Sequence, residues 1–467
     1  MPVSERMEAL LTSLDKAHTG PLYAMKDWDV KILPKTIKGL LQKYHLSKIC
    51  NPDNPVNADD ELADCFFQAG RELALELGLY CEDTERVIKV TEEELDRAVA
   101  AAPRSLTLGG GKDEVILRPR RPESPVVPCV MAPLALMVSE RYAAGVMAGT
   151  AKYRSLVDVL NGVTIEGPTG REMRAGTPYE TWLGFYEQEL KAHALKLINR
   201  EEMATCNVAN SVTEYGHLGG CAASPGKNGL SLCLLPSEMK ITFANFHRAI
   251  NTIHCGQILY AGSPSYIGGY AGSVEGAVLV NIANDLLFTA ILRADCGGDN
   301  VFDINTFSNT LPKAIWGNSV AIQATTRNTD LITIRIVNMV SGPMTPAFFY
   351  EALTGHVNHS TAGATMAIAP RSAGGRYTDY ISPVEAWWCA QVFKSAAGMT
   401  RAQANELVKQ VVPKYQAELA HPPKGVPCYE CFDFGRLEPT PEYRAFYKAM
   451  EREAIELGVP MERFPVL

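Results

Sequence analysis

The sequence predicts an α/β fold, a TIM (β/α)8 barrel with an N-terminal helical segment and a C-terminal helical extension. Three observations lead to this prediction. Short apolar runs alternate with helical segments, capping motifs open several helices, and 467 residues at 46% hydrophobic composition can bury a large core. Because such alternation is typical of parallel strands joined by helices, we favour a closed barrel over an open doubly wound sheet at this length.

Helix starts are marked by a capping residue with a glutamate three positions later. Thr91 and Glu94 have this spacing, and "TPYE" (177–180) and "SPVE" (382–385) add a proline at the first helical position. Within residues 178–198, apolar side chains recur at spacings of three and four, which predicts one packed helix face. We therefore expect helices to begin at all three motifs.

Short apolar runs between these helices are the predicted strands. They are "LCLLP" near residue 232, "ILYAG" near 259, "VFDIN" near 303, "ITIRIV" near 334 and "ATMAIAP" near 366. A stretch dense in glycine and proline, "LGGGKDEVILRPRRPESPVVP", interrupts the chain before them. We expect a helical segment at 1–104 packed on the barrel, the catalytic barrel at 105–398, and the helical extension at 399–467.

Charge and composition exclude several classes of protein. The net charge is −8 and the densest basic run, "LRPRRP", is short, which argues against nucleic-acid binding. The longest apolar stretch, "GAVLVNIANDLLFTAIL", contains Asn281, Asn284 and Asp285, so no membrane span is expected. No secretory signal is recognisable, and the 12 cysteines are expected to be reduced thiols in the cytoplasm.

A glycine cluster, "YIGGYAGSVEG" (266–276), follows a predicted strand and opens a predicted helix. Gly268, Gly269 and Gly272 are therefore candidates for contact with a cofactor or an anion through the main chain. The spacing lacks the dinucleotide fingerprint and the lysine of a P-loop. A tight strand-to-helix turn at the barrel rim is the alternative interpretation.

Several motifs in order along the chain carry a resemblance to a known family. They are "KDWDVKILPKTIKGLLQKYHL", "QAGRELALELGLYCEDTERVIKVTEEEL", "DVLNGVTIEG", "TPYETW", "IGGYAGSVEG", "SGPMT" and "PPKGVPCYECFDF". Together they resemble the monomethylamine:corrinoid methyltransferase family. The resemblance implies a TIM barrel, a homohexamer, an anaerobic one-carbon metabolism, and transfer of a methyl group to the cobalt of a small cognate corrinoid (cobalamin) protein, with no cofactor bound tightly by the chain itself.

Cys206, in "EEMATCNVANS", falls where that family has pyrrolysine when "TPYE" is carried forward without gaps. The resemblance implies that the pyrrolysine imine accepts methylamine as an adduct, which a thiol cannot do. A glutamate and a glutamine that contact that ring in the family align near Ser263 and Ile336. We therefore expect a small methylated donor other than monomethylamine.

A donor that already carries positive charge, a quaternary ammonium or sulfonium compound, needs aromatic faces and a counter-charge. The candidates for the aromatic wall are Tyr260, Tyr266, Tyr270 and Trp316, with Asp303 or Glu275 as the carboxylate. Each tyrosine read alone is more often an ordinary partly buried residue.

General acid catalysis is a second chemistry, with Glu214, His217 or Asp303 as the proton donor to the departing group. Cys206 could orient the substrate or engage it covalently. Alternatively, Cys206 is simply a small residue that leaves empty the space that a long side chain fills in the family, because a neutral thiol behaves as a small hydrophobe.

Zinc-dependent transfer from a neutral O- or S-methyl donor is a third, less favoured chemistry, and we assign no metal ligand. Ligand types near one another in sequence are Cys206, His217, Cys221, His254 and Cys255, and "HVNH" (356–359) could share a helix face. His254 and Cys255 are adjacent, so they would point to opposite faces of a strand. A non-catalytic binding protein that retains the fold is the alternative from a different class.

Overall fold

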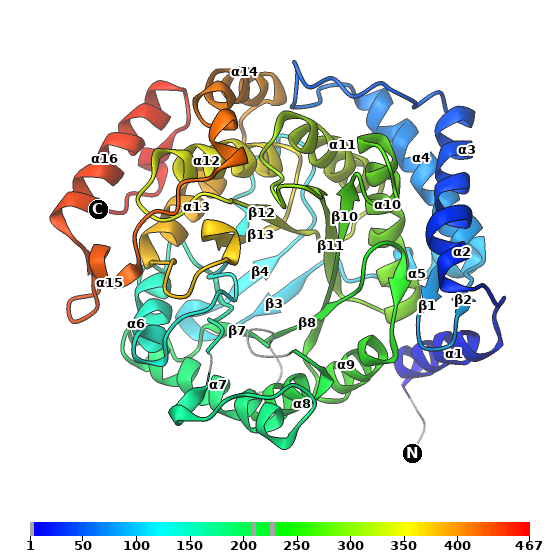
Figure 1. Ribbon diagram of the computed structural model, residues 1–467, viewed down its shortest axis with the longest axis horizontal. Helices are drawn as coiled ribbons and strands as arrows, with labels where there is room; N and C mark the ends of the chain where they lie inside the picture. Colours follow the sequence, from blue (N-terminus) through cyan, green and yellow to red (C-terminus); the bar gives the residue numbers. More distant parts are fainter. Residues whose placement is uncertain (1–3, 166, 208–211, 225–228) are drawn as a thin grey trace.

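Eight parallel strands form the centre of the computed structural model, which describes residues 4–165, 167–207, 212–224 and 229–467 (Figure 1). They are β5 (Cys129–Ala132), β6 (Val159–Leu160), β7 (Ala204–Asn207), β8 (Leu230–Leu234), β10 (Ile258–Ile267), β11 (Cys296–Asp303), β12 (Ile334–Asn338) and β13 (Met366–Arg371). Their order in the sheet is β11-β10-β8-β7-β6-β5-β13-β12. Each strand thus lies beside its neighbour in the chain, apart from the seam where β11 and β12 meet.

A helix follows every barrel strand and covers the outside of the sheet (Figure 1). These helices are α6 (Glu140–Ala151), α7 (Pro178–Lys196), α8 (Glu214–Ala223), α9 (Phe243–His254), α10 (Val274–Leu287), α11 (Pro312–Asn328), α12 (Pro346–Thr361) and α13 (Pro383–Ser395). The fold class predicted from the sequence, an α/β TIM barrel, is confirmed by this arrangement.

Side chains complete the barrel where the backbone ladder between β11 and β12 is sparse. One parallel bridge joins Gly297 to Thr333, and the Gly297 N–H donates to the carbonyl of Ile332 at 3.1 Å. Nearer the carboxyl ends, the Ile336 N–H donates to Oδ1 of Asn300 at 2.8 Å. The Asn300 side chain replaces a backbone hydrogen-bond partner, so buried backbone groups at the seam are hydrogen-bonded without a continuous ladder.

The amino-terminal end of the barrel is closed by a hairpin of β3 (Leu106–Leu108) and β4 (Val115–Leu117). Leu108 and Leu117 are fully buried in the same apolar cluster as the inward-facing strand residues. The Gly110 N–H donates to the carbonyl of Glu202, just before β7, at 2.9 Å. The barrel therefore opens only toward its carboxyl end among the parts that the structure describes.

The N-terminal segment packs on α10 through α3 (Leu33–Lys43), α4 (Asp60–Leu77) and α5 (Glu92–Ala101), whereas α1 (Glu5–Thr19) packs on α9 and on the helical turn Phe288–Leu292 that follows α10. A small sheet joins it to the barrel segment, because β1 (Leu79–Cys81) pairs with β2 (Arg86–Ile88) and with β9 (Lys240–Ile241). On the opposite side lie α15 (Cys428–Cys431) and α16 (Pro441–Glu456), with β14 (Phe432–Asp433) and β15 (Glu438–Pro439) between them in the chain (Figure 1). α14 (Arg401–Val411) contacts the N-terminal segment, because Nη1 of Arg401 lies 2.6 Å from Oδ1 of Asp60.

The predicted helix starts agree with the structure at all three motifs, but the capping chemistry differs at one. Capping boxes form at Thr91 and at Ser382. Thr177 makes no side-chain cap; its hydroxyl donates to the Arg174 carbonyl at 2.7 Å. Glu180 instead accepts from Thr213, at the start of α8, and so ties two neighbouring helices together.

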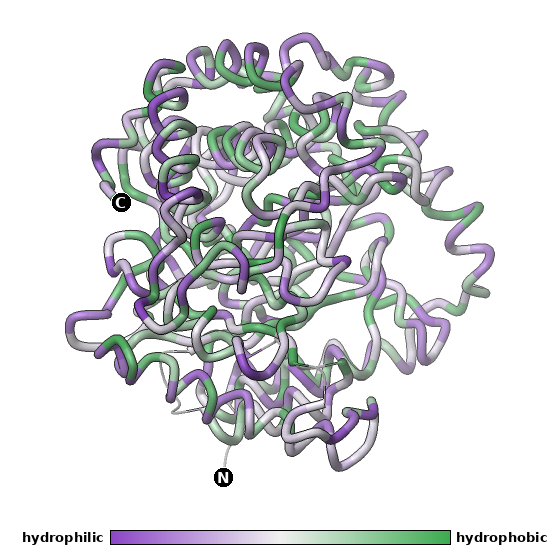
Figure 2. The backbone as a smooth tube through the Cα atoms, turned by 60° about the vertical axis from the view of Figure 1, so that its left-hand side comes forward, coloured by the Kyte–Doolittle hydropathy of each residue, from purple (hydrophilic) through white to green (hydrophobic). Residues whose placement is uncertain are grey.

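Polar and apolar residues alternate along the outer helices (Figure 2), whereas every residue of α10 is buried, including Glu275, Asn281, Asn284 and Asp285. Residues Val274–Leu292 are long and apolar enough to span a membrane by length and composition, but their most apolar window is wholly buried inside the protein. α4, α11 and the strands surround this helix. Its composition is that of a core helix.

Candidate active site at the mouth of the barrel

A cavity of about 310 Å³ lies at the carboxyl ends of the barrel strands. Its lining is predominantly apolar and includes residues from seven of the eight strands or the loops that follow them. The lining residues are Met131, Leu134, Ala135, Asn161, Leu232, Leu234, Tyr260, Gly262, Ser263, Pro264, Tyr266, Gly298, Asn300, Phe302, Phe307, Ile336, Asn338, Ile368 and Arg371. This is the end of a TIM barrel at which active sites are found.

Three aromatic rings form one wall of the cavity. The Tyr266 ring centroid lies 6.1 Å from that of Phe302 and 6.0 Å from that of Phe307, the latter pair edge to face. Tyr260 adds a fourth ring deeper in the barrel and is 1% exposed. Tyr260 and Tyr266 were candidates from the sequence, whereas the two phenylalanines were missed; alternation along "VFDIN" would have pointed Phe302 inward.

The glycine turn positions Tyr266 and leaves no free glycine N–H for an anion. Gly268 donates to the Gly272 carbonyl, Gly269 to Tyr266 and Gly272 to Gly269, at 2.8–3.1 Å. A Cβ on Gly269 would lie 2.8 Å from Oε1 of Glu238 and 2.9 Å from Cβ of Tyr266. The expected cofactor contact of these three glycines is therefore corrected to a structural turn.

Glu238 holds this turn against the barrel. Its carboxylate accepts from the Tyr266 N–H at 2.8 Å and from the Ala271 N–H. Burial raises the pKa of Glu238 to about 7, although both backbone hydrogen bonds act in the opposite direction. The orientation of Tyr266 at the cavity thus depends on a buried carboxyl group that sequence reasoning did not identify.

Asp303 and Glu214 lie outside the cavity lining. Oδ1 of Asp303 accepts from the N–H groups of Asn305 and Thr306 at 3.1 and 3.0 Å, and so shapes the loop that presents Phe307. Glu214 is a half-buried residue in the first turn of α8. Asp303 therefore supports the aromatic wall from outside the cavity.

Trp316 and Glu275 lie away from the cavity, which corrects their expected place in the pocket wall. Trp316 packs edge to face on Phe66 of α4, with ring centroids 5.9 Å apart. Oε1 of Glu275, on α10, accepts from the N–H groups of Ile49 and Cys50, both at 3.0 Å. Both side chains belong to the contact between the barrel helices and the N-terminal segment.

Tyr270 is an exposed residue of the glycine turn and is absent from the cavity lining. Nζ of Lys240 lies 5.4 Å from its ring centroid, a cation–π contact at the surface. Tyr270 is therefore not part of the cavity wall, contrary to the sequence prediction, because the turn directs its side chain outward.

Cys206 is fully buried inside the barrel, beneath the cavity floor. It pairs in register with Leu230 of β8, whereas the cavity begins at Leu232 and Leu234, further toward the carboxyl end of the same strand. Burial raises the pKa of the Cys206 thiol to about 12. The group beneath the cavity is therefore a neutral thiol with the character of a small apolar side chain.

The residues considered as zinc ligands are divided between two sides of the barrel wall. Cys206 faces the interior, while Sγ of Cys221 lies 3.7 Å from Nδ1 of His217 in a polar cluster between the strands and the outer helices. Burial lowers the pKa values of His217 and His356 to about 3. Within the described residues, no three His, Cys, Asp or Glu side chains come together as a metal site.

Arg371, at the end of β13, is the charged residue of the described cavity lining. None of the described residues forms a hydrogen bond or ion pair with its guanidinium. Burial lowers its pKa, as does neighbouring Arg376. Sequence reasoning missed Arg371, although its position directly after the predicted strand "ATMAIAP" was a usable signal.

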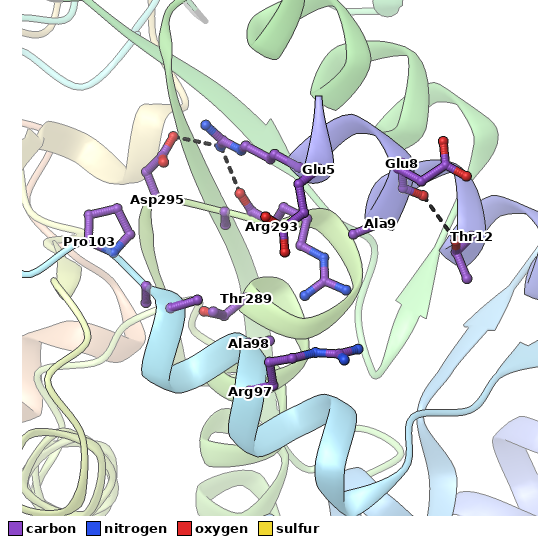
Figure 3. A pocket seen from close by; sticks show the side chains of 14 residues that line it. Glu5, Glu8, Ala9, Thr12, Arg97, Ala98, Pro103, Thr289, Arg293 and Asp295 are labelled. Atoms are coloured by element: carbon purple, nitrogen blue, oxygen red, sulfur yellow. Dashed lines mark hydrogen bonds and ion pairs between the residues drawn. The ribbon is translucent and has the colours of Figure 1, made fainter. Parts of the chain in front are cut away.

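A larger hollow of about 660 Å³ lies at the opposite end of the barrel, between α1, α5 and the start of β11 (Figure 3). One ion pair lies in it: Nη2 of Arg6 contacts Oδ2 of Asp295, and also the Arg293 carbonyl, both at 2.7 Å. It receives none of the carboxyl ends of the strands. We therefore place the candidate active site in the smaller cavity at the mouth.

Comparison with known proteins identifies the family. The family model for monomethylamine methyltransferase MtmB matches residues 9–459. Monomethylamine methyltransferase MtmB of Methanosarcina mazei is 27% identical over 451 residues, which cover 95% of this chain and 97% of the relative. MtmB3 of Methanosarcina barkeri is 26% identical over the same length.

Solved structures agree with this assignment in fold. The crystal structure of the M. barkeri monomethylamine methyltransferase superposes with a TM-score of 0.92 at 24% identity, covering 96% of this chain and 98% of that one. A structure of the hydroxylamine MtmB complex matches equally well. With a family match over nearly the whole chain, the resemblance predicted from the sequence motifs is confirmed: the chain belongs to the monomethylamine methyltransferase MtmB family.

Proposed function

We propose that this protein is a corrinoid-dependent methyltransferase. It moves a methyl group from a small N-methyl or quaternary ammonium compound, other than monomethylamine, to cobalt(I) of a corrinoid carried by a cognate partner protein. Family membership supports the reaction class. The observation that carries the donor class is the aromatic cavity above a buried, neutral Cys206.

None of the described residues in the floor and walls of the cavity carries a group able to form an adduct with an amine. The Cys206 thiol is buried and protonated, and the positions aligned with the family glutamate and glutamine are Ser263 and Ile336. Ser263 and Ile336 both line the cavity. A donor whose nitrogen is already fully substituted needs no such adduct, because its amine is a competent leaving group.

The chain's own residues supply binding and positioning. The faces of Tyr266, Phe302 and Phe307 attract an onium group, and the apolar lining excludes water from it. The transfer breaks the N–C bond, leaves that electron pair on nitrogen, and forms a Co–C bond with an electron pair from cobalt(I). The partner docks over the open mouth, so that the methyl group faces outward.

The same proposal includes a cytoplasmic location and a homo-oligomer, a hexamer by family resemblance. The cysteines in the described part of the chain are all free thiols, which suits a reducing compartment. Zinc-dependent transfer receives no support from the ligand positions, because Cys206 and Cys221 lie on opposite sides of the barrel wall. The non-catalytic alternative is tested by the experiment that follows.

A donor screen tests the proposal. Purified protein is mixed with a cobalt(I) corrinoid acceptor and a panel of methylated amines, betaines, sulfonium compounds, thioethers and methoxy compounds, and zinc content is measured on the same sample. We expect methylation of cobalt by quaternary or sulfonium donors in metal-free protein, and none with monomethylamine. Activity confined to neutral donors, with one zinc per chain, contradicts the proposed quaternary or sulfonium donor. Absence of methyl transfer from every donor tested contradicts a catalytic function.

A further inference from the structure

We propose that Arg371 is a substrate-positioning residue that binds a carboxylate, so that the methyl donor is a small betaine-like compound carrying both an onium group and a carboxylate. The inference rests on the proposed function and narrows its substrate class. It begins from the charge at the mouth of the barrel, where Arg371 is the cation of the described lining and no carboxylate accompanies it.

The guanidinium of Arg371 is half-buried and unsatisfied. It is removed from much of its hydration by the cavity walls, yet none of the described residues offers it an acceptor. Two buried arginines elsewhere in this chain have acceptors: Arg200 pairs with Asp113 at 2.7 Å, and Arg120 donates to the carbonyls of Ser360 and Ala364. Leaving a desolvated cation unmatched is costly, and an anionic ligand removes that cost.

A second unpartnered polar group lies at the same cavity. Asn161, just after β6, is 1% exposed; its Oδ1 is buried without a partner and its side chain makes no hydrogen bond with the described residues. β5 lies between the strands that carry Asn161 and Arg371. Of the other two asparagines of the lining, Asn300 accepts from the Ile336 N–H and Asn338 donates to the Phe307 carbonyl, although Oδ1 of Asn338 is also buried without a partner among the described residues.

The aromatic rings and the guanidinium together select for a zwitterion. Tyr266 is close enough to Arg371 for each to influence the pKa of the other, so the ring wall and the cation share one cavity. An onium group without an anion would be repelled by Arg371. A carboxylate can accept two parallel N–H bonds from the planar guanidinium while the methyl-bearing nitrogen lies against the rings.

Calorimetric titration of the full-length protein tests the inference by binding, without cobalt. The probes are glycine betaine and tetramethylammonium, which share the onium group and differ in the carboxylate. N,N-dimethylglycine tests the number of N-methyl groups, and a betaine with one more methylene tests the distance between the two charges. We expect a carboxylate probe to bind at least about tenfold more tightly than tetramethylammonium. Arg371→Met should remove that preference, and Arg371→Lys should restore part of it.

The comparison of probes on the unmodified protein keeps the test valid even if Arg371→Met folds poorly. Equal affinity for all probes, or a carboxylate preference that survives in Arg371→Met, overturns the inference. Cobalt methylation then separates the two proposals. If tetramethylammonium and glycine betaine methylate cobalt equally well, Arg371 does not position the donor, but the protein is a methyltransferase. If binding depends on Arg371 but no donor methylates cobalt, Arg371 binds the carboxylate, and the proposed methyl transfer is wrong.

Discussion

Two arginines on neighbouring strands, Arg335 of β12 and Arg371 of β13, have opposite environments. Arg335 is fully buried on the outer side of the barrel wall, where Nη2 lies 2.5 Å from Oδ2 of Asp285 and Nη1 donates to Asn281 and to the Asp299 carbonyl. Arg371 faces the cavity with no acceptor among the described residues. The same side chain is part of the fold in one place and available to a ligand in the other.

Arg335 and Arg371 differ in their hydrogen-bond partners as well as in their burial. Arg335 bridges β11 and α10 at the seam, where the backbone ladder is weakest. Asp299, on the same side, has its pKa raised by burial to about 8 and accepts from Ser265 and Asn284. At the seam the charged groups of Arg335, Asp285 and Asp299 all have hydrogen-bond partners, whereas the Arg371 guanidinium at the mouth has none among the described residues.

Replacing each arginine by methionine gives the largest expected contrast. Arg335→Met leaves Asp285 buried without its ion partner and should lower the free energy of unfolding by about 3–5 kcal/mol. Arg371→Met removes an unmatched cation and should change it by less than about 1 kcal/mol in either direction. Chemical denaturation followed by circular dichroism measures both. Similar losses in the two variants would contradict the distinction drawn between them.

A second contrast concerns Glu238, the buried carboxyl behind Tyr266. Its pKa is about 7 in the folded protein against an ordinary value of 4.5, so the folded state holds the proton more tightly. Stability from this group is present below pH 4.5 and is lost as pH rises to about 7, with a slope approaching about 1.4 kcal/mol per pH unit. Glu238→Gln should flatten the stability profile in that window.

The control for this titration is Glu201→Gln, which removes an exposed carboxylate instead. Denaturation midpoints at pH 5, 6 and 7 compare the three proteins. An unchanged slope in Glu238→Gln would mean that the glycine turn is held without a proton on this carboxyl.

A smaller effect is expected at the glycine turn itself. Gly269→Ala places a Cβ within 3 Å of both Glu238 and Tyr266, and the overpacking should cost about 1–3 kcal/mol and weaken ligand binding through a displaced Tyr266. Gly39→Ala is the matched control, because Gly39 lies in α3 with no atom within 4 Å of an added Cβ. It should stabilise the protein by about 0.5–1 kcal/mol. Thermal melts and titration with glycine betaine measure both consequences.

The sequence predicted the later half of the barrel better than the first. The five predicted strands overlap β8, β10, β11, β12 and β13, which are five or more residues long. β5, β6 and β7 have only four, two and four residues, too few for a periodic signal. The resemblance to the family predicted a complete barrel even though these three strands were not recognised in the sequence.

The candidate site was predicted less completely, because a pocket is a product of three-dimensional proximity. Tyr260 and Tyr266 reach the cavity through strand alternation in β10, which the sequence displays. Trp316 and Glu275 are equally suitable by residue type, but they lie on helix faces turned toward α4 and the N-terminal segment. Arg371 became a candidate only once the lack of a partner was visible.

The smallest expected effects are at Cys206, and they test whether the barrel interior is inert beside its open mouth. With no exposed surface and a pKa of about 12, the Cys206 thiol should resist iodoacetamide at pH 8 in the folded protein, whereas half-buried Cys255 should react. Peptide mapping by mass spectrometry distinguishes the two sites. Cys206→Ala should cost about 1 kcal/mol and leave cobalt methylation within a few-fold of the unmodified protein, since removing a neutral thiol takes away only packing. Rapid alkylation of Cys206, together with loss of methyl transfer in Cys206→Ala at preserved stability, would show instead that the thiol takes part in the reaction.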